Sequence, residues 1–408
     1  MGSAYHFNLE FSKTPMKRNR KSSKPRLSAD GEKLVSLALG LASSQSRSED
    51  RYWEHALANL LISLADAKRD SVIDSALDHL YQNHEAGFAT LIEEGESVAE
   101  SLTLAHNGAA WDVLLISVPF IVASKFSIAT GAVAAELLAA VHTRLMDDVV
   151  APQGRLAIAP FLYSLEHLPQ KFSALRDMAR TLGLAAINGT TTDLAFKAKD
   201  EVPQLVADTR FLIAAIATPR GAAHFQWQAW ENRSHHGRSH TLDRWMASSP
   251  TAFTPLLPGC QFQTLLPDAY FCNAREADRH IRPVSLQSAI GFLTATLKVT
   301  ETELRAVVAA FGEEVAEEMR IGFAVGKSPD IVHGEVWPLL LEEDESGALL
   351  EIEACLRAGG VVQIDALSDR YPPDSCADCG APLFADGTGE VVHPELPEQV
   401  DVQTTTLH

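Results

Sequence analysis

Asp112-Val-Leu-Leu-Ile-Ser-Val-Pro-Phe-Ile-Val-Ala123 is an almost unbroken apolar run that is rich in valine and isoleucine. Its length and its β-branched content favour a buried strand over a helix. A second run of this kind extends from Thr209 to Ala217, and the segment between the two predicts a helix at 132–145, a strand at 154–162 and a helix around 172–182. This β-α-β-α-β order is typical of helices packed on a sheet.

The C-terminal half repeats this order of elements. A strand is predicted at 261–266 and a helix at 285–299, and the capping-box pattern Thr300-x-x-Glu303 predicts a further helix that reaches Phe311. After it we expect a hairpin of 320–325 with 331–340, a helix around 349–356 and a strand at 361–364. The chain therefore predicts an α+β or α/β fold with two β-α-β-α-β units, arisen either by internal duplication or independently.

Helical spacing of apolar residues dominates the N-terminal quarter. Leucines recur at helical intervals from Leu34 to Leu64, and two further periodic segments cover 72–81 and 88–104. Four helices joined by short polar turns predict a bundle. The organisation expected along the chain is a disordered basic leader (1–27), a helical domain (28–106), a first α/β unit (109–230), a polar linker (231–258), a second α/β unit (259–370), a knuckle with a hairpin (371–397) and a flexible tail (398–408).

Charge is distributed unevenly along the 408 residues. The first 26 residues hold seven Lys and Arg against one Glu, which leaves 27 basic and 52 acidic residues in the remainder. An acidic body repels nucleic acid and anionic membranes, so the basic leader is the segment predicted to touch a polyanion. A solvated leader without a partner is the simpler expectation. Met16 precedes the basic run and is an alternative start to Met1.

The composition is that of a globular protein of a reducing compartment. Five irregularly spaced cysteines do not make a disulfide framework, the N-terminus lacks the apolar core of a signal peptide, and no apolar run is long enough to cross a membrane. With 46% hydrophobic residues, the chain can bury a large core. We therefore expect a cytoplasmic protein without a membrane partner.

The motif Cys376-Ala-Asp-Cys379-Gly380 has the spacing of a metal knuckle. Two residues between the thiolates let both sulfurs face one ion, and Gly380 can adopt the positive φ that closes the loop. Asp386-Gly387 lies between two short apolar runs and predicts a hairpin that brings His393 beside Cys379. Cys376, Cys379 and His393 are thus candidate ligands of one structural zinc ion.

Other interpretations of the Cys-x-x-Cys motif stay open. A closed zinc site has four ligands, and Cys355, His408 or a carboxylate would have to supply the fourth. The motif can also be a turn without metal. A redox pair is the weakest alternative, because pairs of the thioredoxin type open a helix, whereas Gly380 and Pro382 predict a loop.

A charged stretch between Asp268 and Pro283 is the second candidate site. It follows the strand that opens the second unit, where α/β proteins bind ligands, and its arginines and tyrosine can bind a carboxylate or a phosphate. The candidate anion ligands are Tyr270, Arg275, Arg279 and Arg282. The alternative is an internally paired charged turn, because acidic and basic residues alternate within it.

Histidines give weaker signals. Four of them gather near the predicted linker, at His224, His235, His236 and His240, but Gly237 and the lack of a fixed carboxylate partner argue against a metal site. His333 lies on the same face of the predicted hairpin as Trp337 and is expected to pack on a helix.

Several short motifs, taken in order, resemble a proteobacterial family that is catalogued only as a domain of unknown function, number 2863. The motifs lie at 48–54 (Ser-Glu-Asp-Arg-Tyr-Trp-Glu), 256–260, 266–271, 275–279, 332–338 (Val-His-Gly-Glu-Val-Trp-Pro) and 376–384. The likeness covers nearly the whole chain from about Ser28 to Pro397. It implies a cytoplasmic bacterial protein and transfers no catalytic residue.

Three functional hypotheses follow. The leading one is a binding or interaction protein with a structural zinc knuckle, whose partner is a protein or a small anionic ligand. The alternative is an enzyme that acts on an anionic small molecule in a cleft between the two α/β units. A nucleic-acid-associated protein that uses the basic leader is the second alternative. No serine or cysteine nucleophile pairs with a base in the sequence, so no reaction is assigned.

Overall fold

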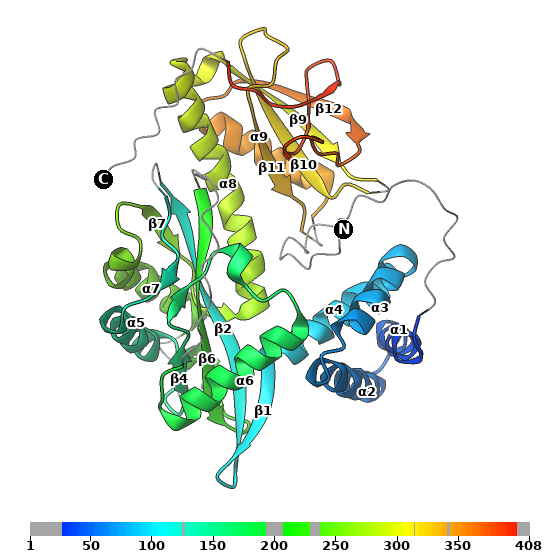
Figure 1. Ribbon diagram of the computed structural model, residues 1–408, viewed down its shortest axis with the longest axis vertical. Helices are drawn as coiled ribbons and strands as arrows, with labels where there is room; N and C mark the ends of the chain where they lie inside the picture. Colours follow the sequence, from blue (N-terminus) through cyan, green and yellow to red (C-terminus); the bar gives the residue numbers. More distant parts are fainter. Residues whose placement is uncertain are drawn as a thin grey trace.

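The computed structural model describes residues 27–124, 127–192, 207–228, 237–313, 315–340 and 343–397. Figure 1 shows a helical bundle, a sheet with helices on both faces, and a second, smaller sheet, with the long helix α8 running between the two sheets. The fold is thus mixed α and β. The basic leader, the tail from 398, His235 and His236 lie outside the described residues.

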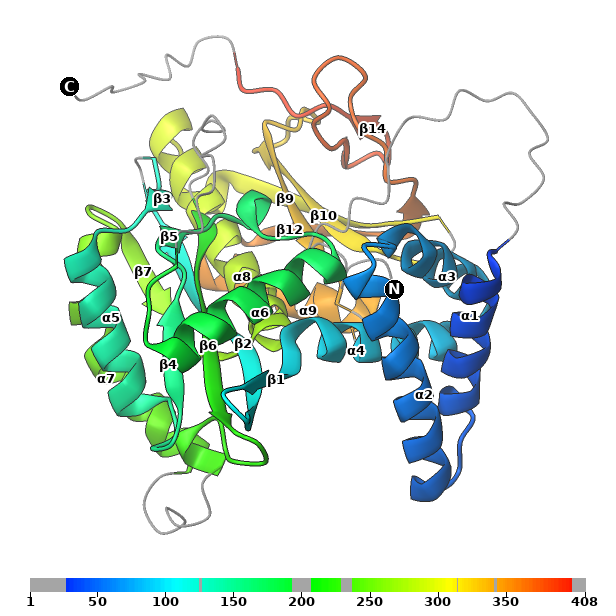
Figure 2. The ribbon, with the colours of Figure 1, turned by 60° about the horizontal axis from the view of Figure 1, so that its bottom comes forward.

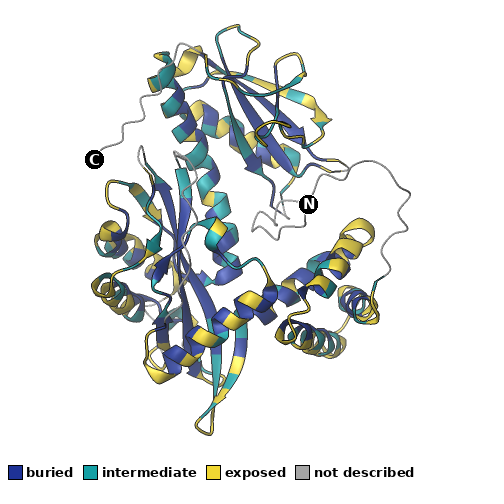
Figure 3. Cartoon of the chain, in the orientation of Figure 1, coloured by how far each residue is buried: buried dark blue, intermediate teal, exposed yellow. Residues whose placement is uncertain are grey.

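The N-terminal helices form where the periodicity predicts them. Ser28 caps the first helix and Ser46 the second, each through a side-chain oxygen that accepts a backbone N–H. Their leucines are buried in a shared core, while the outer faces are exposed (Figure 3). The helices are α1 (Ala29–Ala42), α2 (Arg47–Asp66), α3 (Asp70–Asn83) and α4 (Glu85–Glu100).

The last of these helices is shorter than predicted. It ends at Glu100, and the next residues form strand β1 (Ser101–His106) instead of a further helical turn. Asn107 and Gly108 have φ values of 50° and 78°, the left-handed backbone of a two-residue hairpin turn into β2 (Ala109–Ala123). The Asn-Gly dipeptide is the sequence signal for this turn. The prediction of helix up to residue 104 was wrong because tertiary pairing with β2 outweighs helical periodicity.

Strand β2 is the centre of the first sheet, as its apolar run predicts. It pairs from Trp111 to Ala123 with β6 (Ala207–Pro219), and β4 (Arg155–Ile158) continues the sheet beyond β6. The other edge of β2 is shared by β1 near one end and by β8 (Asp268–Ala269) and β7 (Gln261–Thr264) near the other. All of these pairings are antiparallel.

Helices cover both faces of this sheet (Figure 2). Odd-numbered residues of β2 and β6, such as Val113 and Ile213, belong to the core shared with α6 (Phe172–Asn188) and the bundle. Even-numbered residues such as Phe120 belong to a second core. That core is completed by α5 (Ala135–Asp148) and α7 (Arg238–Phe253). The alternation of side chains along each strand therefore separates the two cores.

Shorter elements here are β3 (Gly131–Ala132), β5 (Phe161–Leu162) and the 3-10 turns Leu165–His167, Gln226–Gln228 and Thr254–Leu256.

Two expected boundaries are corrected in this region. The predicted polar linker contains α7, whose buried residues Thr241, Trp245, Ser249 and Phe253 recur every four residues and face the sheet. The strand predicted at 261–266 adds to the first sheet, although it was expected to open the second unit. Both errors come from polar composition around residue 240, which hides a helix that buries only a narrow stripe.

The second sheet has the order β11-β10-β9-β12. Strand β10 (Glu318–Val325) pairs antiparallel with β11 (His333–Pro338), which confirms the predicted hairpin, and with β9 (Leu304–Phe311). Strand β12 (Gln363–Tyr371) runs parallel to β9, and α9 (Glu345–Ala358) packs on the sheet. Because strand order and direction differ between the two sheets, the topology does not confirm a duplication.

The capping box at Thr300 forms as predicted, but it does not open an α-helix. Thr300 and Glu303 cap the 3-10 turn Glu301–Glu303, and the chain then enters strand β9. Seven of the eight residues of β9 are buried, because helices cover one of its faces and the C-terminal segment lies over the other. Burial on both faces gives an apolar run that local pattern cannot distinguish from a helix.

Helix α8 (Tyr270–Leu297) replaces the loop that was expected after residue 268. Its first half, including Tyr270 and Ala277, belongs to the core of the first sheet. Its second half, from Leu286 to Leu293, belongs to the core of the second sheet. Pro283 lies inside the helix between these halves. Within the described residues, no helix is long and apolar enough to cross a membrane.

Candidate metal centre

The C-terminal segment, residues 372–397, lies over the second sheet and carries the Cys-x-x-Cys motif. The amide of Cys376 donates to the carbonyl of Ala381 (2.7 Å), and that of Gly380 donates to the carbonyl of Cys376 (2.9 Å). Gly380 has a φ of 75° and closes this loop. Strands β13 (Phe384–Ala385) and β14 (Val391–Val392) then pair antiparallel. This pairing returns the chain towards the loop.

The return brings three metal-binding side chains together. Each pair of ligand atoms among Cys376, Cys379 and His393 lies within 4.8 Å, and the Cys379 Sγ is 3.3 Å from the His393 Nε2. Hydrogen bonds from the backbone amides of Cys379 and Asp378 lower the pKa of the Cys376 thiol. The thiolate, which is the form that binds metal, is therefore favoured at this position.

This donor set fits a zinc ion. Thiolate sulfur binds zinc at about 2.3 Å and imidazole nitrogen at about 2.0 Å, so two such ligands on a tetrahedral ion are about 3.5 Å apart, close to the separation seen here. The other ring nitrogen of His393, Nδ1, lies 3.7 Å from Glu395 Oε1, where a carboxylate can orient a ligating imidazole. The group formed by the described residues supplies three ligands.

Arg320 on β10 fixes the base of the metal-binding loop. Its Nη1 donates to the carbonyls of Asp374 (2.8 Å) and Leu383 (2.5 Å), which flank the loop on either side. The guanidinium also pairs with Glu318 and lies 4.3 Å from the centre of the Phe311 ring. The Arg320 side chain is almost fully buried, and Glu318 compensates its positive charge. A buried, paired arginine therefore anchors the loop to the sheet. The sequence analysis missed this residue, because nothing in the local pattern marks it.

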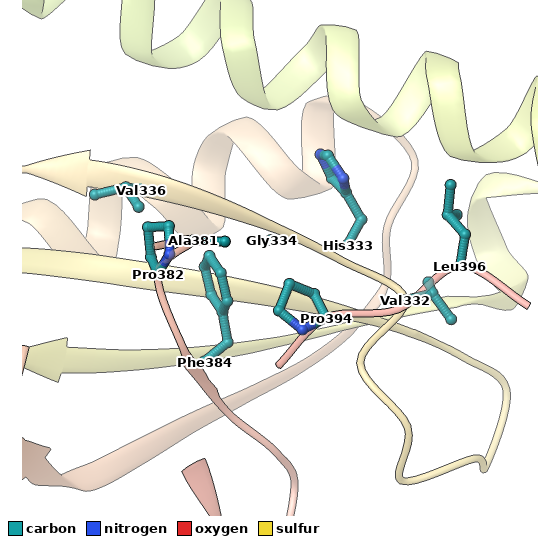
Figure 4. A pocket seen from close by; sticks show the side chains of 9 residues that line it. All are labelled: Val332, His333, Gly334, Val336, Ala381, Pro382, Phe384, Pro394 and Leu396. Atoms are coloured by element: carbon teal, nitrogen blue, oxygen red, sulfur yellow. The ribbon is translucent and has the colours of Figure 1, made fainter. Parts of the chain in front are cut away.

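A pocket of about 330 Å³ lies between the C-terminal segment and the β10–β11 hairpin (Figure 4). Ala381 and Pro382 follow the Cys-x-x-Cys loop directly, and Pro394 follows His393, so the pocket borders the metal-binding residues in sequence. His333 is among the lining residues, but its ring lies on the α8 side of β11, against Phe292 and Phe323. The lining residues are Val332, His333, Gly334, Val336, Ala381, Pro382, Phe384, Pro394 and Leu396.

The predicted anion ligands all lie on α8, and their charges are compensated within the protein. Arg275 contacts both oxygens of Glu96 (2.7 and 2.8 Å), and Arg279 pairs with Glu276 at 2.6 Å. Tyr270 is buried in the core. This geometry favours the alternative interpretation of the stretch, in which its charges are paired internally.

Arg282, the third of these arginines, is buried and holds α8 to the second sheet. It forms a bidentate pair with Glu343 (2.7 and 2.8 Å) and donates to the carbonyl of Pro338. Its guanidinium also lies 4.9 Å from the centre of the Trp337 ring.

The histidine cluster near residue 235 is described only in part. His224 follows β6, and burial lowers the pKa of its imidazole. His240 lies on α7. His333 packs between Phe292 of α8 and Phe323 of β10, as its predicted contact with a helix requires.

Comparison with known proteins identifies a family, but no similar curated protein and no similar solved structure. A search of curated proteins and a search of solved structures each found no match. A family described as "Protein of unknown function (DUF2863)" matches residues 19–407. The match extends beyond Pro397, where the resemblance was expected to end. It confirms the family indicated by the sequence motifs, and the chain therefore belongs to this family of proteins of unknown function, DUF2863.

Proposed function

We propose that the protein is a binding protein whose C-terminal segment is held on the second sheet by a structural zinc ion at Cys376, Cys379 and His393. One observation carries this proposal. Ligand atoms that are up to 17 residues apart in sequence converge within 4.8 Å of one another.

A metal would add the stability that this segment otherwise lacks. Strands β13 and β14 have two residues each, and a short two-stranded hairpin is marginal in water. Structural zinc contributes its binding free energy to folding, because the unfolded chain holds no preformed site. The thiols must stay reduced to bind the ion, so the proposal also places the protein in a reducing compartment.

Binding, as opposed to catalysis, is supported by what surrounds the metal centre. The adjoining pocket is apolar, while the arginines that the enzyme hypothesis needs are paired with Glu96, Glu276 and Glu343. No observation on the described residues favours an active site for an anionic substrate. The leader that the nucleic-acid hypothesis needs lies outside them.

Elemental analysis tests the proposal. Protein purified without a chelator and without a histidine tag is expected to contain close to one zinc ion per chain. Cys376→Ser is expected to lose the ion and to make residues 372–397 more sensitive to limited proteolysis, since the link between the Cys-x-x-Cys loop and His393 is then lost. Cys260→Ser, which changes a cysteine far from the motif in sequence, is the matched control and is expected to keep the zinc.

Two results would contradict a structural zinc. The first is a parent protein that contains no metal while both thiols of the motif react freely with a thiol reagent. The second is a Cys376→Ser variant that retains zinc and resists proteolysis as the parent does.

A further inference from the structure

The metal centre has one coordination position that the described residues do not fill. Ligand atoms of Cys376, Cys379 and His393 gather within 4.8 Å, and no further His, Cys, Asp or Glu of the described part of the chain joins them. Zinc in structural sites is almost always four-coordinate, and a site with three protein ligands keeps its fourth position for water or another molecule. Cys379 is exposed and the other two residues are half-buried. The fourth position is therefore at the surface of the protein.

The second sheet separates Cys355, a candidate fourth ligand, from this centre. Cys355 packs against the core that α8 and α9 form on one face of the sheet. Phe384 of β13 and Val392 of β14 pack on the opposite face (Figure 2). Even-numbered residues of β9 belong to the first of these cores and Val307 to the second, as the alternation of side chains along a strand requires. Cys355 is therefore not a ligand of this ion.

The carboxylates of the hairpin already have other partners. One oxygen of Asp386 accepts the backbone N–H groups of Thr388 (2.8 Å) and Glu390 (3.0 Å), which holds this side chain in the turn. Glu395 Oε1 lies 3.7 Å from Nδ1 of His393, the ring nitrogen that does not face the thiols. These contacts orient the turn and the imidazole, so the fourth ligand has to come from outside the described residues.

Charge favours a neutral fourth ligand. A zinc ion with two thiolates and one neutral imidazole has no net charge, and Asp378 in the loop and Glu395 beside His393 add negative charge. The chain as a whole has a formal net charge of −19. A third thiolate or a carboxylate would make the centre anionic in these surroundings, whereas an imidazole nitrogen binds zinc without adding charge.

We propose that the fourth coordination position of the zinc ion binds a neutral imidazole nitrogen that comes from outside the described residues. Two sources share this chemistry: a histidine of a partner protein, and His408 at the end of this chain. The inference rests on the proposed function, because it needs an ion at Cys376, Cys379 and His393. A partner histidine on the zinc would make the metal centre a contact for the partner as well as a support for the C-terminal segment.

Cobalt in place of zinc reports the fourth ligand, because the visible absorption of cobalt depends on its ligands. The cobalt-substituted full-length protein would be titrated at about pH 8 with 1-methylimidazole, whose ring is then mostly neutral, and separately with acetate. We expect 1-methylimidazole to change the spectrum and to saturate at one molecule per chain, while elemental analysis shows that the metal stays bound. Acetate is expected to have no effect at the same concentrations. Binding of acetate as tight as that of 1-methylimidazole would overturn the ligand class.

The variant His408→Ala distinguishes the two sources. Equal responses of parent and variant would support a partner histidine, because the position is then open in the isolated chain. A response of the variant alone would support His408 as the imidazole that fills the position in the parent. No response in either protein would overturn the proposal, since a different ligand then holds the position.

Cys355→Ser is the matched control. The residue lies across the sheet from the metal centre, so the cobalt spectrum and its response to 1-methylimidazole are expected to equal those of the parent. A spectrum that differs before any ligand is added would identify Cys355 as the fourth ligand and overturn the proposal.

Failure of this inference can be told from failure of the proposed function. A parent protein that contains zinc, but whose cobalt form responds to 1-methylimidazole neither as the parent nor as His408→Ala, would refute this inference alone. A parent protein that is purified without zinc and does not bind cobalt would refute both.

Discussion

Burial raises the pKa values of two carboxyl groups, Glu96 and Glu100, where α4 meets α8. Glu100 Oε2 accepts the backbone N–H of Phe271 at 3.0 Å, and Glu96 pairs with Arg275. Burial raises the pKa of Glu100 to about 7, and the neighbouring charge of Glu96 adds to the shift. Burial likewise raises the pKa of Asp278, further along α8, to about 7. The contact between the bundle and α8 therefore contains a group, Glu100, that changes protonation near neutral pH.

Glu100→Gln is expected to change how stability depends on pH. The folded-state pKa of about 7 exceeds the usual value of 4.5, so the folded protein holds this proton more tightly between those limits. Stability is then lost as the pH rises through this window, by about 1 to 3 kcal/mol. Glutamine keeps an acceptor oxygen for Phe271 but cannot ionise. The stability of the variant relative to the parent should therefore increase between pH 5 and pH 8. Urea unfolding at several pH values measures the difference.

Glu85→Gln is the control, because Glu85 is an exposed residue of the same helix. A parent protein whose stability does not fall between pH 5 and pH 8 relative to Glu100→Gln would show that Glu100 is ionised without cost in the fold.

At the scale of elements, close packing of the C-terminal segment on β11 depends on a glycine. The ring of Phe384 from β13 lies directly against Gly334, where a Cβ atom would overlap it. Phe384 is fully buried, together with Ala385. The absence of a side chain on β11 therefore decides how near the metal-bearing segment can come to the sheet.

Gly334→Ala is expected to displace β13 and with it the loop that carries Cys376. Overpacking a well-packed core costs about 1 to 3 kcal/mol, and here the strain falls on the packing of Phe384 against β11. We expect limited proteolysis to cut residues 372–397 faster and the affinity for zinc to fall. Gly291→Ala on α8 is the comparison, since a Cβ there meets no atom within 4 Å. Equal behaviour of the two variants would mean that the segment shifts without cost.

Over the whole molecule, α8 contributes side chains to two separate cores, one under each of the two larger sheets. Its first half packs in the core of the first sheet and its second half in that of the second. Arg282 lies near the middle and reaches Glu343 and the carbonyl of Pro338. The two sheets are therefore expected to unfold together, because fraying of α8 in one core removes packing from the other.

Arg282→Met is expected to weaken this coupling. Removing one partner of a buried ion pair leaves the other charge uncompensated and costs about 3 kcal/mol. We expect the thermal midpoint to fall and calorimetry to show two transitions in place of one. Arg279→Met changes a more exposed arginine of the same helix and is expected to have little effect. A single transition with an unchanged midpoint in Arg282→Met would show that α8 does not depend on this contact.

Local pattern was sufficient wherever the chain's own periodicity decides the structure. The leucine spacing of the bundle, the apolar runs of β2 and β6 and the β10–β11 hairpin all appear in the sequence because each depends on neighbours within a few residues. The proximity of His393 to Cys379 belongs to the same class, since one Asp-Gly turn is enough to bring them together.

Only the tertiary structure decided the features that depend on distant partners. Strand β9 has a capping box and an apolar run that fit a helix, but sheet pairing on both edges and burial on both faces make it a strand. The charged stretch after residue 268 is a helix whose apolar face is buried in the core of the first sheet, and its arginines pair with Glu96 and Glu343, which are far away in sequence. Burial and charge compensation at long range are properties of the assembled core, so no window of sequence contains them.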